Sequence, residues 1–368
     1  MLKVINVISD SNIGGAGRML LVFLRNYDRD NIDMKVLLPT GAALIPEIES
    51  LGVRCITDGG LREKSFDRAA VKRLKKIFRQ EKPDIVHTHA SMSARIAAKA
   101  AGSRIVYTRH SVFPNSAFKT RFPVKQLYGA VNDYYADAVI AVSPAASDLL
   151  AEAGQSPKKI KVIYNGVDPL ARPGAPERAA ARAEYGLGAE CFLCGIFARL
   201  TPVKGHDYVL EAASSLKNET AIKFVIAGTG EIEEHLKKTA DGMGLKNVVF
   251  TGFLSGVETL MGACDLQINA SYGTEATSLS LLEGMSMGIP AVASSFGGNP
   301  YVISHGENGL IFPEKDAGAL AGAIMSVYGD RGLYERLSEN SLRIFKEKFT
   351  ASKMTENIER LYYSIASS

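Results

Sequence analysis

Short apolar runs alternate with helical segments along the whole chain, and this alternation is the feature that most constrains the fold. Parallel strands need crossover helices that cover both faces of a sheet, so the pattern predicts an α/β protein of doubly wound, Rossmann-like sheets. The clearest predicted helix, residues 66–80, carries Leu74 and Phe78 on one face. The predicted strands are residues 4–8, 34–38, 53–57, 85–87, 105–108, 138–142, 161–164, 192–197, 223–226, 247–251, 266–269, 291–293 and 309–312.

A chain of 368 residues is long enough for two domains of ordinary size. The segment 165–184, which contains Pro169, Pro173 and Pro176, has the composition of a linker that leads into an exposed helix. We therefore predict two tandem Rossmann-like domains, residues 1–170 and 171–352, and expect the helix 353–368 to pack back on the first. Ligands of such sheets bind beyond the carboxyl ends of the strands, so the expected site is a cleft between two facing domains.

Hydropathy and cysteine usage indicate a cytoplasmic protein. The apolar runs are shorter than the roughly 20 residues that cross a bilayer, and the first residues lack a basic leader with a cleavage site. The four cysteines are too scattered for a disulfide framework. Cys191 and Cys194 form a C-x-x-C pair without further ligands nearby, so we interpret them as residues of a buried strand and predict no metal site.

Charge is distributed unevenly between the two halves. Residues 1–184 contain 28 Lys and Arg against 18 Asp and Glu, a balance of +10, whereas the remainder has a balance of −6. The first half is therefore expected to meet an anionic partner such as a phospholipid surface or a phosphorylated acceptor, although solvated helix faces could produce the same excess. No nucleic-acid-binding signature accompanies the charge, so no nucleic acid partner is predicted.

Two loops have the composition of phosphate-binding loops. Gly14 and Gly15 follow the first strand and open a helix, where backbone N–H groups can point at an anion; a tight turn without a ligand is the alternative. Arg199 and Lys204 lie five residues apart on the loop that leaves the strand 192–197. An arginine fork and a lysine point charge can together stabilise a diphosphate.

A third segment combines two carboxylates with a helix start. Glu275 and Glu283 are eight positions apart, and the residues between them, Thr277, Ser278 and Leu279, lie where free amides and the helix dipole favour a phosphate. The helix is followed by Gly288, Pro290 and a short strand.

In their order along the chain, these motifs resemble the family 4 glycosyltransferases of the GT-B fold. The resemblance extends over nearly the whole chain and is most specific at residues 195–312, where it also includes the turn beginning at Gly228, the segment Gly252, Phe253 and Leu254, and a later turn that contains Gly297 and Gly298. It implies a glycosyltransferase whose first domain faces the acceptor and whose second domain binds the donor.

The resemblance also implies a role for individual residues. Glu275 would bind donor-sugar hydroxyls, Glu283 the ribose, and Arg199 and Lys204 the diphosphate. The remaining donor contacts would come from Gly14, Gly15, Gly228, Gly252, Phe253, Leu254, Thr277, Ser278 and Leu279. His110, in the sequence Thr-Arg-His, matches a position beside the reacting sugar, so the expected catalytic residues are His110, Glu275, Arg199 and Lys204.

The implied reaction is retaining transfer from a nucleotide-diphosphate sugar, with a UDP-sugar favoured and a GDP-sugar as the alternative, to a hydroxyl acceptor that can be lipid-linked. The product would be a surface glycan or glycolipid. We expect no cofactor and no D-x-D motif of the kind that holds a metal in GT-A enzymes. The alternatives are a GT-B nucleotide-sugar epimerase and a non-catalytic binding module.

Some residues depart from the family pattern or fall outside it. Gly17 replaces the acid of a Gly-Gly-Ala-Glu-Arg loop, and Tyr301 stands where relatives often have an acid. We expect His87 and His89 to face opposite sides of their strand and to make a poor metal pair, so we interpret them as loop-packing or acceptor-side residues. The basic aromatic stretch 109–128 is expected either to rest on anionic lipid, which would make the protein peripheral on the inner face of the membrane, or to form a loop over the cleft.

Overall fold

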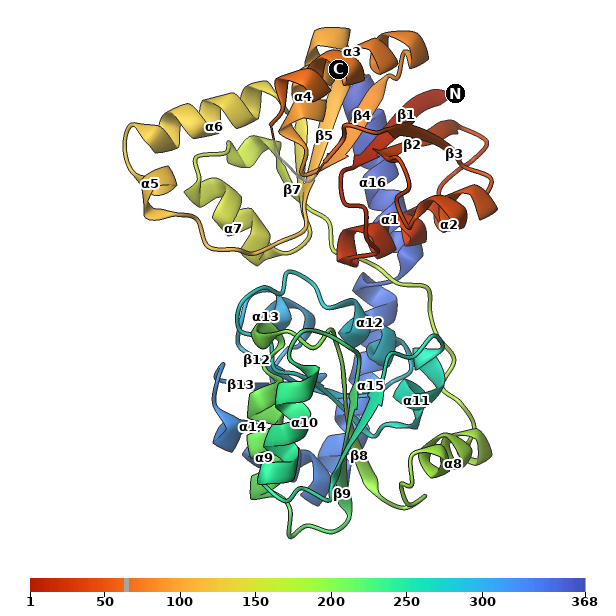
Figure 1. The fold of residues 1–368 in the computed structure, drawn as a ribbon, viewed down its shortest axis with the longest axis vertical. Coiled ribbons are helices and arrows are strands. Elements are labelled where there is room, and N and C mark those ends of the chain that lie inside the picture. The colour runs from red at the N-terminus through yellow and green to blue at the C-terminus, as the bar shows by residue number, and fades with distance from the viewer. Residues whose placement is uncertain (63–65, 368) are drawn as a thin grey trace. The chain divides into compact units, whose positions relative to one another are not determined.

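The computed structural model describes residues 1–62 and 66–367 and divides the chain into two units (Figure 1). The first unit comprises Met1–Val167 together with the chain from Ala351 onward, and the second comprises Asp168–Thr350. The expected boundary lay three residues later, after residue 170. The last residue of the predicted helix 353–368 lies outside the described residues.

The first unit contains a seven-stranded parallel sheet with the order β3-β2-β1-β4-β5-β6-β7. Its strands are β1 (Leu2–Ile8), β2 (Ile32–Pro39), β3 (Arg54–Asp58), β4 (Ile85–His89), β5 (Arg104–Arg109), β6 (Ala138–Ala141) and β7 (Ile160–Val162). Its helices are α1 (Gly15–Asn26), α2 (Ile45–Ser50), α3 (Arg68–Glu81), α4 (Met92–Ala101), α5 (Ala117–Thr120), α6 (Val124–Tyr134), α7 (Pro144–Glu152), the 3₁₀ turn η1 (Pro157–Lys159) and α16 (Ala351–Ala366).

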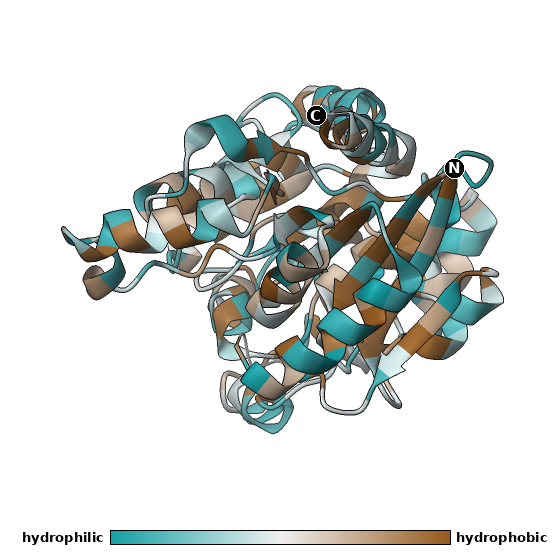
Figure 2. Cartoon of the chain, turned by 90° about the horizontal axis from the view of Figure 1, so that it is seen from above, coloured by the Kyte–Doolittle hydropathy of each residue, from teal (hydrophilic) through white to brown (hydrophobic). Residues whose placement is uncertain are grey.

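Alternate residues of β1 supply two separate cores. Val4 and Ile8 pack with α1 and α16, whereas Ile5 and Val7 pack with α3 and α4. Side chains alternate between the faces of a strand, so a strand that is covered on both faces must be apolar along its whole length. In Figure 2 the strands are largely brown, while the surrounding helices show both brown and teal.

The second unit contains a six-stranded parallel sheet with the order β10-β9-β8-β11-β12-β13. Its strands are β8 (Phe192–Phe197), β9 (Ile222–Ala227), β10 (Val248–Gly252), β11 (Leu266–Asn269), β12 (Ala291–Ser294) and β13 (Gly309–Phe312). Its helices are α8 (Ala175–Glu184), the 3₁₀ turn η2 (Pro202–Lys204), α9 (His206–Ser215), α10 (Glu233–Gly242), α11 (Val257–Ala263), α12 (Leu279–Ser286), α13 (Asn299–Val302), α14 (Ala317–Gly329) and α15 (Arg331–Lys348).

The two parallel sheets confirm the predicted fold class of tandem Rossmann-like units. The stretch 109–128 differs from the expected loop, because it contains α5 and the first half of α6. None of the described helices has the length and hydropathy needed to cross a bilayer.

Candidate functional site

Each sheet has a switch point, which is a pair of neighbouring strands whose following connections run toward opposite edges of the sheet. The neighbours are β1 and β4 in the first unit and β8 and β11 in the second. Loops that leave such strands diverge and open a crevice at the carboxyl ends of the strands, where ligands of these sheets bind. The predicted residues Gly14 and Gly15 follow β1, Arg199 and Lys204 follow β8, and Glu275 follows β11.

The loop after β8 is held by the loop after β9. The Leu200 amide donates to the carbonyl oxygen of Thr229 at 2.9 Å, and the Ile232 amide donates to the carbonyl oxygen of Leu200 at 3.3 Å. Gly228 has a φ of +142°, and a Cβ there would overlap the carbonyl oxygen of Ala198. The glycine is therefore required because the loop after β9 closely approaches the loop that carries Arg199.

Glu275 is the most heavily bonded of the predicted site residues. Its Oε2 accepts hydrogen bonds from Lys204 Nζ at 2.7 Å, Ser271 Oγ at 3.1 Å and Asn269 Nδ2 at 3.3 Å. The side chain is buried, and the three donors hold it in one orientation. Among the described residues, every recorded side-chain bond to this carboxylate reaches Oε2, so the lone pairs of Oε1 are left for a ligand hydroxyl.

Lys204 therefore has a structural partner in addition to the diphosphate expected from the sequence. One of its three N–H donors is committed to Glu275 at 2.7 Å, and two are left for an anion. Arg199 is exposed on the same loop. The pair thus combines a fixed ammonium, which compensates the buried carboxylate, with a solvated guanidinium that can reach a phosphate.

The predicted phosphate-binding helix start is α12. Ser278 is its N-cap, and the Ser278 hydroxyl accepts a hydrogen bond from the Leu281 amide at 3.4 Å. Thr277 and Ser278 are buried, whereas Glu283 lies in the middle of the helix and is partly exposed. The first-turn amides, beginning with Leu279, have no carbonyl partner within the helix and create a positive field.

The predicted base-binding segment lies beside the same loops. Gly252 ends β10 with a φ of +71°, and its carbonyl oxygen accepts a hydrogen bond from the Gly228 amide at 2.9 Å. Phe253 follows with 69% of its surface exposed, and Leu254 is partly buried. The second unit therefore brings together the loops of Arg199, Gly228 and Gly252.

Gly14, Gly15 and His110 belong to the first unit. Gly14 is the N-cap of α1, and Gly15 is the first residue of that helix, whose first turn has no acidic side chain. A Cβ at Gly15 would meet no described atom within 4 Å, so protein packing does not demand glycine there. At Gly17, a Cβ would approach Leu44 Cδ1 to 2.8 Å, so the larger acid of the family loop would require the Leu44 side chain to shift.

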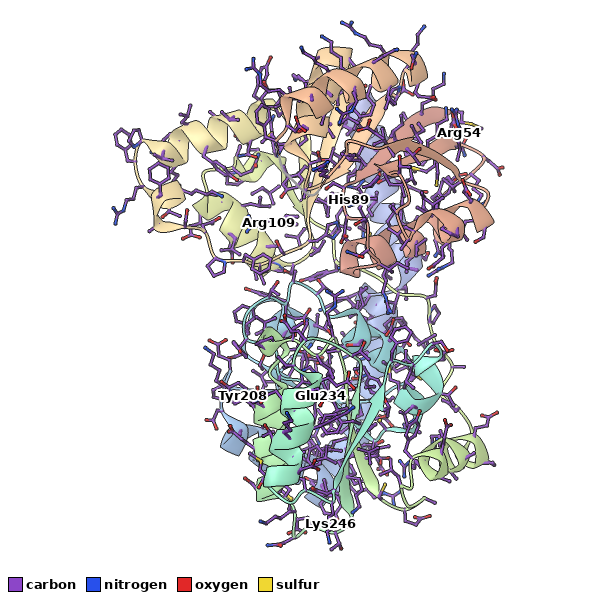
Figure 3. All side chains as sticks on the ribbon, in the orientation of Figure 1. Arg54, His89, Arg109, Tyr208, Glu234 and Lys246 are labelled. Carbon is purple, nitrogen blue, oxygen red and sulfur yellow. The ribbon has the colours of Figure 1, made fainter. Side chains whose placement is uncertain are left out.

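Three histidines form a cluster at the carboxyl ends of β4 and β5, with His87 and His89 buried and His110 partly exposed (Figure 3 labels His89). The rings of His87 and His89 are 4.6 Å apart, and those of His89 and His110 are 5.0 Å apart. The expectation that His87 and His89 face opposite sides was wrong, because residues i and i+2 of a strand lie on the same face. Both rings lie on the face covered by α16, where His87 Nδ1 is 2.6 Å from the Tyr362 hydroxyl.

The cluster is electrically neutral at physiological pH. Burial, together with the charge of a neighbouring histidine, lowers the pKa of His87 to about 3, and burial lowers the pKa of His110 to about 4. The pKa of His89 is lowered by burial and by both neighbours. Neutral imidazoles can exchange hydrogen bonds with hydroxyl groups but supply no positive charge.

Sequence reasoning missed the polar residues that orient these groups. They are Asn6 and Tyr362 beside the histidines, and Asn269, Ser271 and Asn299 beside Glu275. One signal could have found two of them: Asn6 and Asn269 are amides inside otherwise apolar strands, and a buried amide needs hydrogen-bond partners.

Among the residues that the structure describes, acidic, cysteine and histidine side chains do not assemble into a metal site, because no group of three or more of them could hold a metal ion. The expectation that the sequence lacks D-x-D was wrong, because Asp28-Arg29-Asp30 has that spacing. However, this segment lies at the amino end of β2, where the Asp28 carboxylate accepts hydrogen bonds from the Asp30 and Asn31 amides.

Comparison with known proteins agrees with this architecture. The family described as Glycosyltransferase Family 4 matches residues 13–169, and the family described as Glycosyl transferases group 1 matches residues 178–343. The chain is 29% identical to a UDP-Gal:alpha-D-GlcNAc-diphosphoundecaprenol alpha-1,3-galactosyltransferase of Escherichia coli, over 80% of this chain and 79% of that one. It is 24% identical to an N-acetyl-alpha-D-glucosaminyl L-malate synthase of Bacillus anthracis, over 82% of this chain and 80% of that one.

Solved structures agree in fold. The crystal structure of Anabaena Alr3699/HepE in complex with UDP matches with a TM-score of 0.86 and 23% identity, over 99% of this chain and 100% of that one. A sucrose-phosphate synthase from Thermosynechococcus elongatus matches with a TM-score of 0.80 and 18% identity, over the full length of both chains. The two family matches together extend over most of the chain, and the chain belongs to the family 4 glycosyltransferases of the GT-B fold.

Proposed function

We propose that this glycosyltransferase moves a hexosyl or N-acetylhexosaminyl group from a UDP-sugar to a hydroxyl of a lipid-linked acceptor, with retention of configuration and without a metal. The observation that carries the proposal is the Glu275 carboxylate, which is held through Oε2 by three donors while Oε1 is left for sugar hydroxyls. A buried, oriented carboxylate is suited to fixing a polyhydroxylated ligand, because each hydroxyl can donate to it.

The charges around this carboxylate suit the departure of a diphosphate. Arg199, the two remaining donors of Lys204 and the first amides of α12 offer positive field to the negative charge that develops on the leaving group. The acceptor hydroxyl then attacks the face from which the diphosphate departs, and the leaving phosphate oxygen takes its proton. No protein base is required for this proton transfer, and none of the neutral histidines needs to ionise.

The choice of UDP as the donor nucleotide rests on the relatives. The Escherichia coli relative uses UDP-Gal, as its name states, and the Anabaena structure holds UDP. The donor can be tested with purified protein and a panel of UDP- and GDP-sugars. A UDP-sugar at 100 times its Kd is expected to stabilise the protein by about 2.7 kcal/mol in thermal unfolding. Stabilisation by GDP-sugars alone would contradict the UDP assignment.

The lipid-linked acceptor is supported by a surface of the first unit. On α5, α6 and the segment before them, large apolar side chains are exposed: Phe113, Phe118, Phe122, Leu127, Val131 and Tyr134. Leu127, Val131 and Tyr134 follow the spacing of one helix face. Interspersed among the rings are Lys119, Arg121 and Lys125. We call this set of apolar and basic residues the α5–α6 surface; it projects from the first sheet in Figure 1.

Apolar rings surrounded by cations are typical of a surface that binds anionic lipid. The charge excess of +10 in residues 1–184 also favours attraction to an anionic membrane. Each cation near such a membrane contributes about 1 kcal/mol, so replacing Lys119, Arg121 and Lys125 together with Ser should lower recruitment to anionic vesicles more than tenfold. The measurement is the fraction of protein that floats with vesicles containing phosphatidylglycerol.

A matched control removes the same charge from the other unit. Lys217, Lys238 and Lys246 are exposed in the second unit (Figure 3 labels Lys246), and their replacement with Ser should leave flotation unchanged. Equal flotation of both triple variants would contradict lipid binding through the α5–α6 surface. Loss of donor affinity in the α5–α6 variant would instead assign this surface to the nucleotide site.

A further inference from the structure

A line of hydrogen bonds connects a buried asparagine to His110. Asn6 lies in the middle of β1 and is fully buried. Its Oδ1 is 3.1 Å from His89 Nε2, and His89 Nδ1 is 2.8 Å from His110 Nε2. Each of these contacts holds a single proton, so the orientation of the asparagine amide decides where every proton of the line lies.

The other side of the amide fixes its orientation. Asn6 Nδ2 is 3.0 Å from the thioether sulfur of Met34, which can accept a hydrogen bond but has no proton to donate. A hydrogen bond from Asn6 also lowers the pKa of the Tyr362 phenol, against the larger opposite effect of burial. With the amide reversed, Oδ1 would face the sulfur, acceptor against acceptor. The nitrogen therefore faces Met34 and Tyr362, and the oxygen faces His89.

The proton positions in the two histidines follow. Asn6 Oδ1 can only accept, so His89 carries its proton on Nε2. A neutral imidazole has a single N–H, which makes His89 Nδ1 an acceptor and requires His110 to donate from its own Nε2. Burial lowers the pKa of both rings and keeps them neutral. The unprotonated nitrogen of His110 is then Nδ1.

We propose that Asn6 and His89 are positioning residues that hold His110 in the Nε2–H tautomer, so that His110 Nδ1 accepts a hydrogen bond from a hydroxyl of a sugar substrate bound at the first unit. The tautomer assignment rests on the first unit alone, and its consequence for the substrate rests on the function proposed above. With the opposite tautomer, His110 Nδ1 would carry a proton, and the same hydroxyl would have to accept a hydrogen bond from it instead of donating one.

The tautomer can be measured without any substrate. Two-bond ¹H–¹⁵N correlation spectra of protein labelled at histidine distinguish a protonated ring nitrogen from a bare one, and the His110→Gln variant assigns the signals. We expect a protonated Nε2 and a bare Nδ1 at both His89 and His110. A protonated Nδ1 at His110 would overturn the assignment whatever the enzyme's substrate proves to be.

Two substitutions test the role of Asn6. Asn6→Leu keeps approximately the volume but removes the acceptor, so His110 should populate both tautomers and kcat/KM should fall at least tenfold. Asn6→Asp keeps an acceptor oxygen toward His89 and should retain the Nε2–H tautomer. If Asn6→Leu does not fold, Asn6→Asp still tests the proposal. A changed His110 tautomer in Asn6→Asp would refute it.

A control variant removes a hydrogen-bond partner of His87, which is not part of the line from Asn6 to His110. Thr108 Oγ1 lies 2.6 Å from His87 Nε2, so Thr108→Val also removes a buried polar atom but does not touch the line from Asn6 to His110. We expect it to leave the His110 tautomer unchanged and kcat/KM within twofold. An unchanged tautomer in Asn6→Leu, or equal losses of activity in Asn6→Leu and Thr108→Val, would show that Asn6 contributes only packing. A changed tautomer with unaltered kinetics would refute the contact of His110 with a sugar substrate.

Discussion

His206 should make the second unit sensitive to acid. It is the first residue of α9, it is fully buried, and neither ring nitrogen has a hydrogen-bond partner among the described residues. Burial, with a smaller contribution from the charge of Lys204, lowers the pKa of this ring from 6.5 to about 4. The unfolded chain therefore binds a proton more tightly than the native protein does, and stability must fall as the pH falls below 6.5.

The size of the effect follows from the two pKa values. At pH 5 the unfolded state is almost fully protonated at this residue and the native state is about nine-tenths neutral, so linkage costs about 2 kcal/mol relative to pH 7 and above. Below pH 4 both states bind the proton and no further stability is lost. His206→Phe, an apolar ring of similar size, does not titrate and should lose about 2 kcal/mol less between pH 7 and pH 5.

Urea unfolding followed by circular dichroism at pH 7, 6 and 5 measures this difference. The comparison uses the change with pH, so any constant packing cost of the phenylalanine cancels. His235→Gln is the matched control, because His235 is an exposed histidine of the same unit. Parallel pH profiles for His206→Phe and the wild type would refute the buried neutral state of His206.

Three further outcomes are expected. Lys204→Ala should lower kcat/KM at least tenfold, because it removes charge-assisted bonds worth about 1.5 to 3 kcal/mol; activity within twofold of the wild type would exclude a role in transfer. Transfer should persist in EDTA, since the proposed leaving-group contacts are side chains and amides, and loss that Mn²⁺ or Mg²⁺ reverses would contradict this. Gly228→Ala should destabilise the protein by about 1 to 3 kcal/mol in thermal unfolding, whereas Gly242→Ala, at an open helix end, should not.

Local sequence patterns were enough to predict the strands and the order of the site motifs, but not the helices within residues 109–128. The strands predicted at 192–197, 266–269 and 309–312 coincide with β8, β11 and β13, because the apolar pattern of a fully covered strand is a local property of the chain. The sequence also predicted that Arg199 and Lys204 lie on a loop that follows a strand, and in a parallel sheet the loops after neighbouring strands meet at one edge.

The partners of the site side chains, in contrast, depend on how distant segments of the chain pack together. Lys204 reaches Glu275 across 71 residues of sequence, and Tyr362 reaches His87 across 275. Asn6 meets the histidines because β1 pairs with β4 and places Asn6 opposite His87. Such contacts depend on strand order and register, which are set when distant segments pack together. A local pattern carries no information about them, and for that reason the sequence could name Glu275 and His110 but not the groups that orient them.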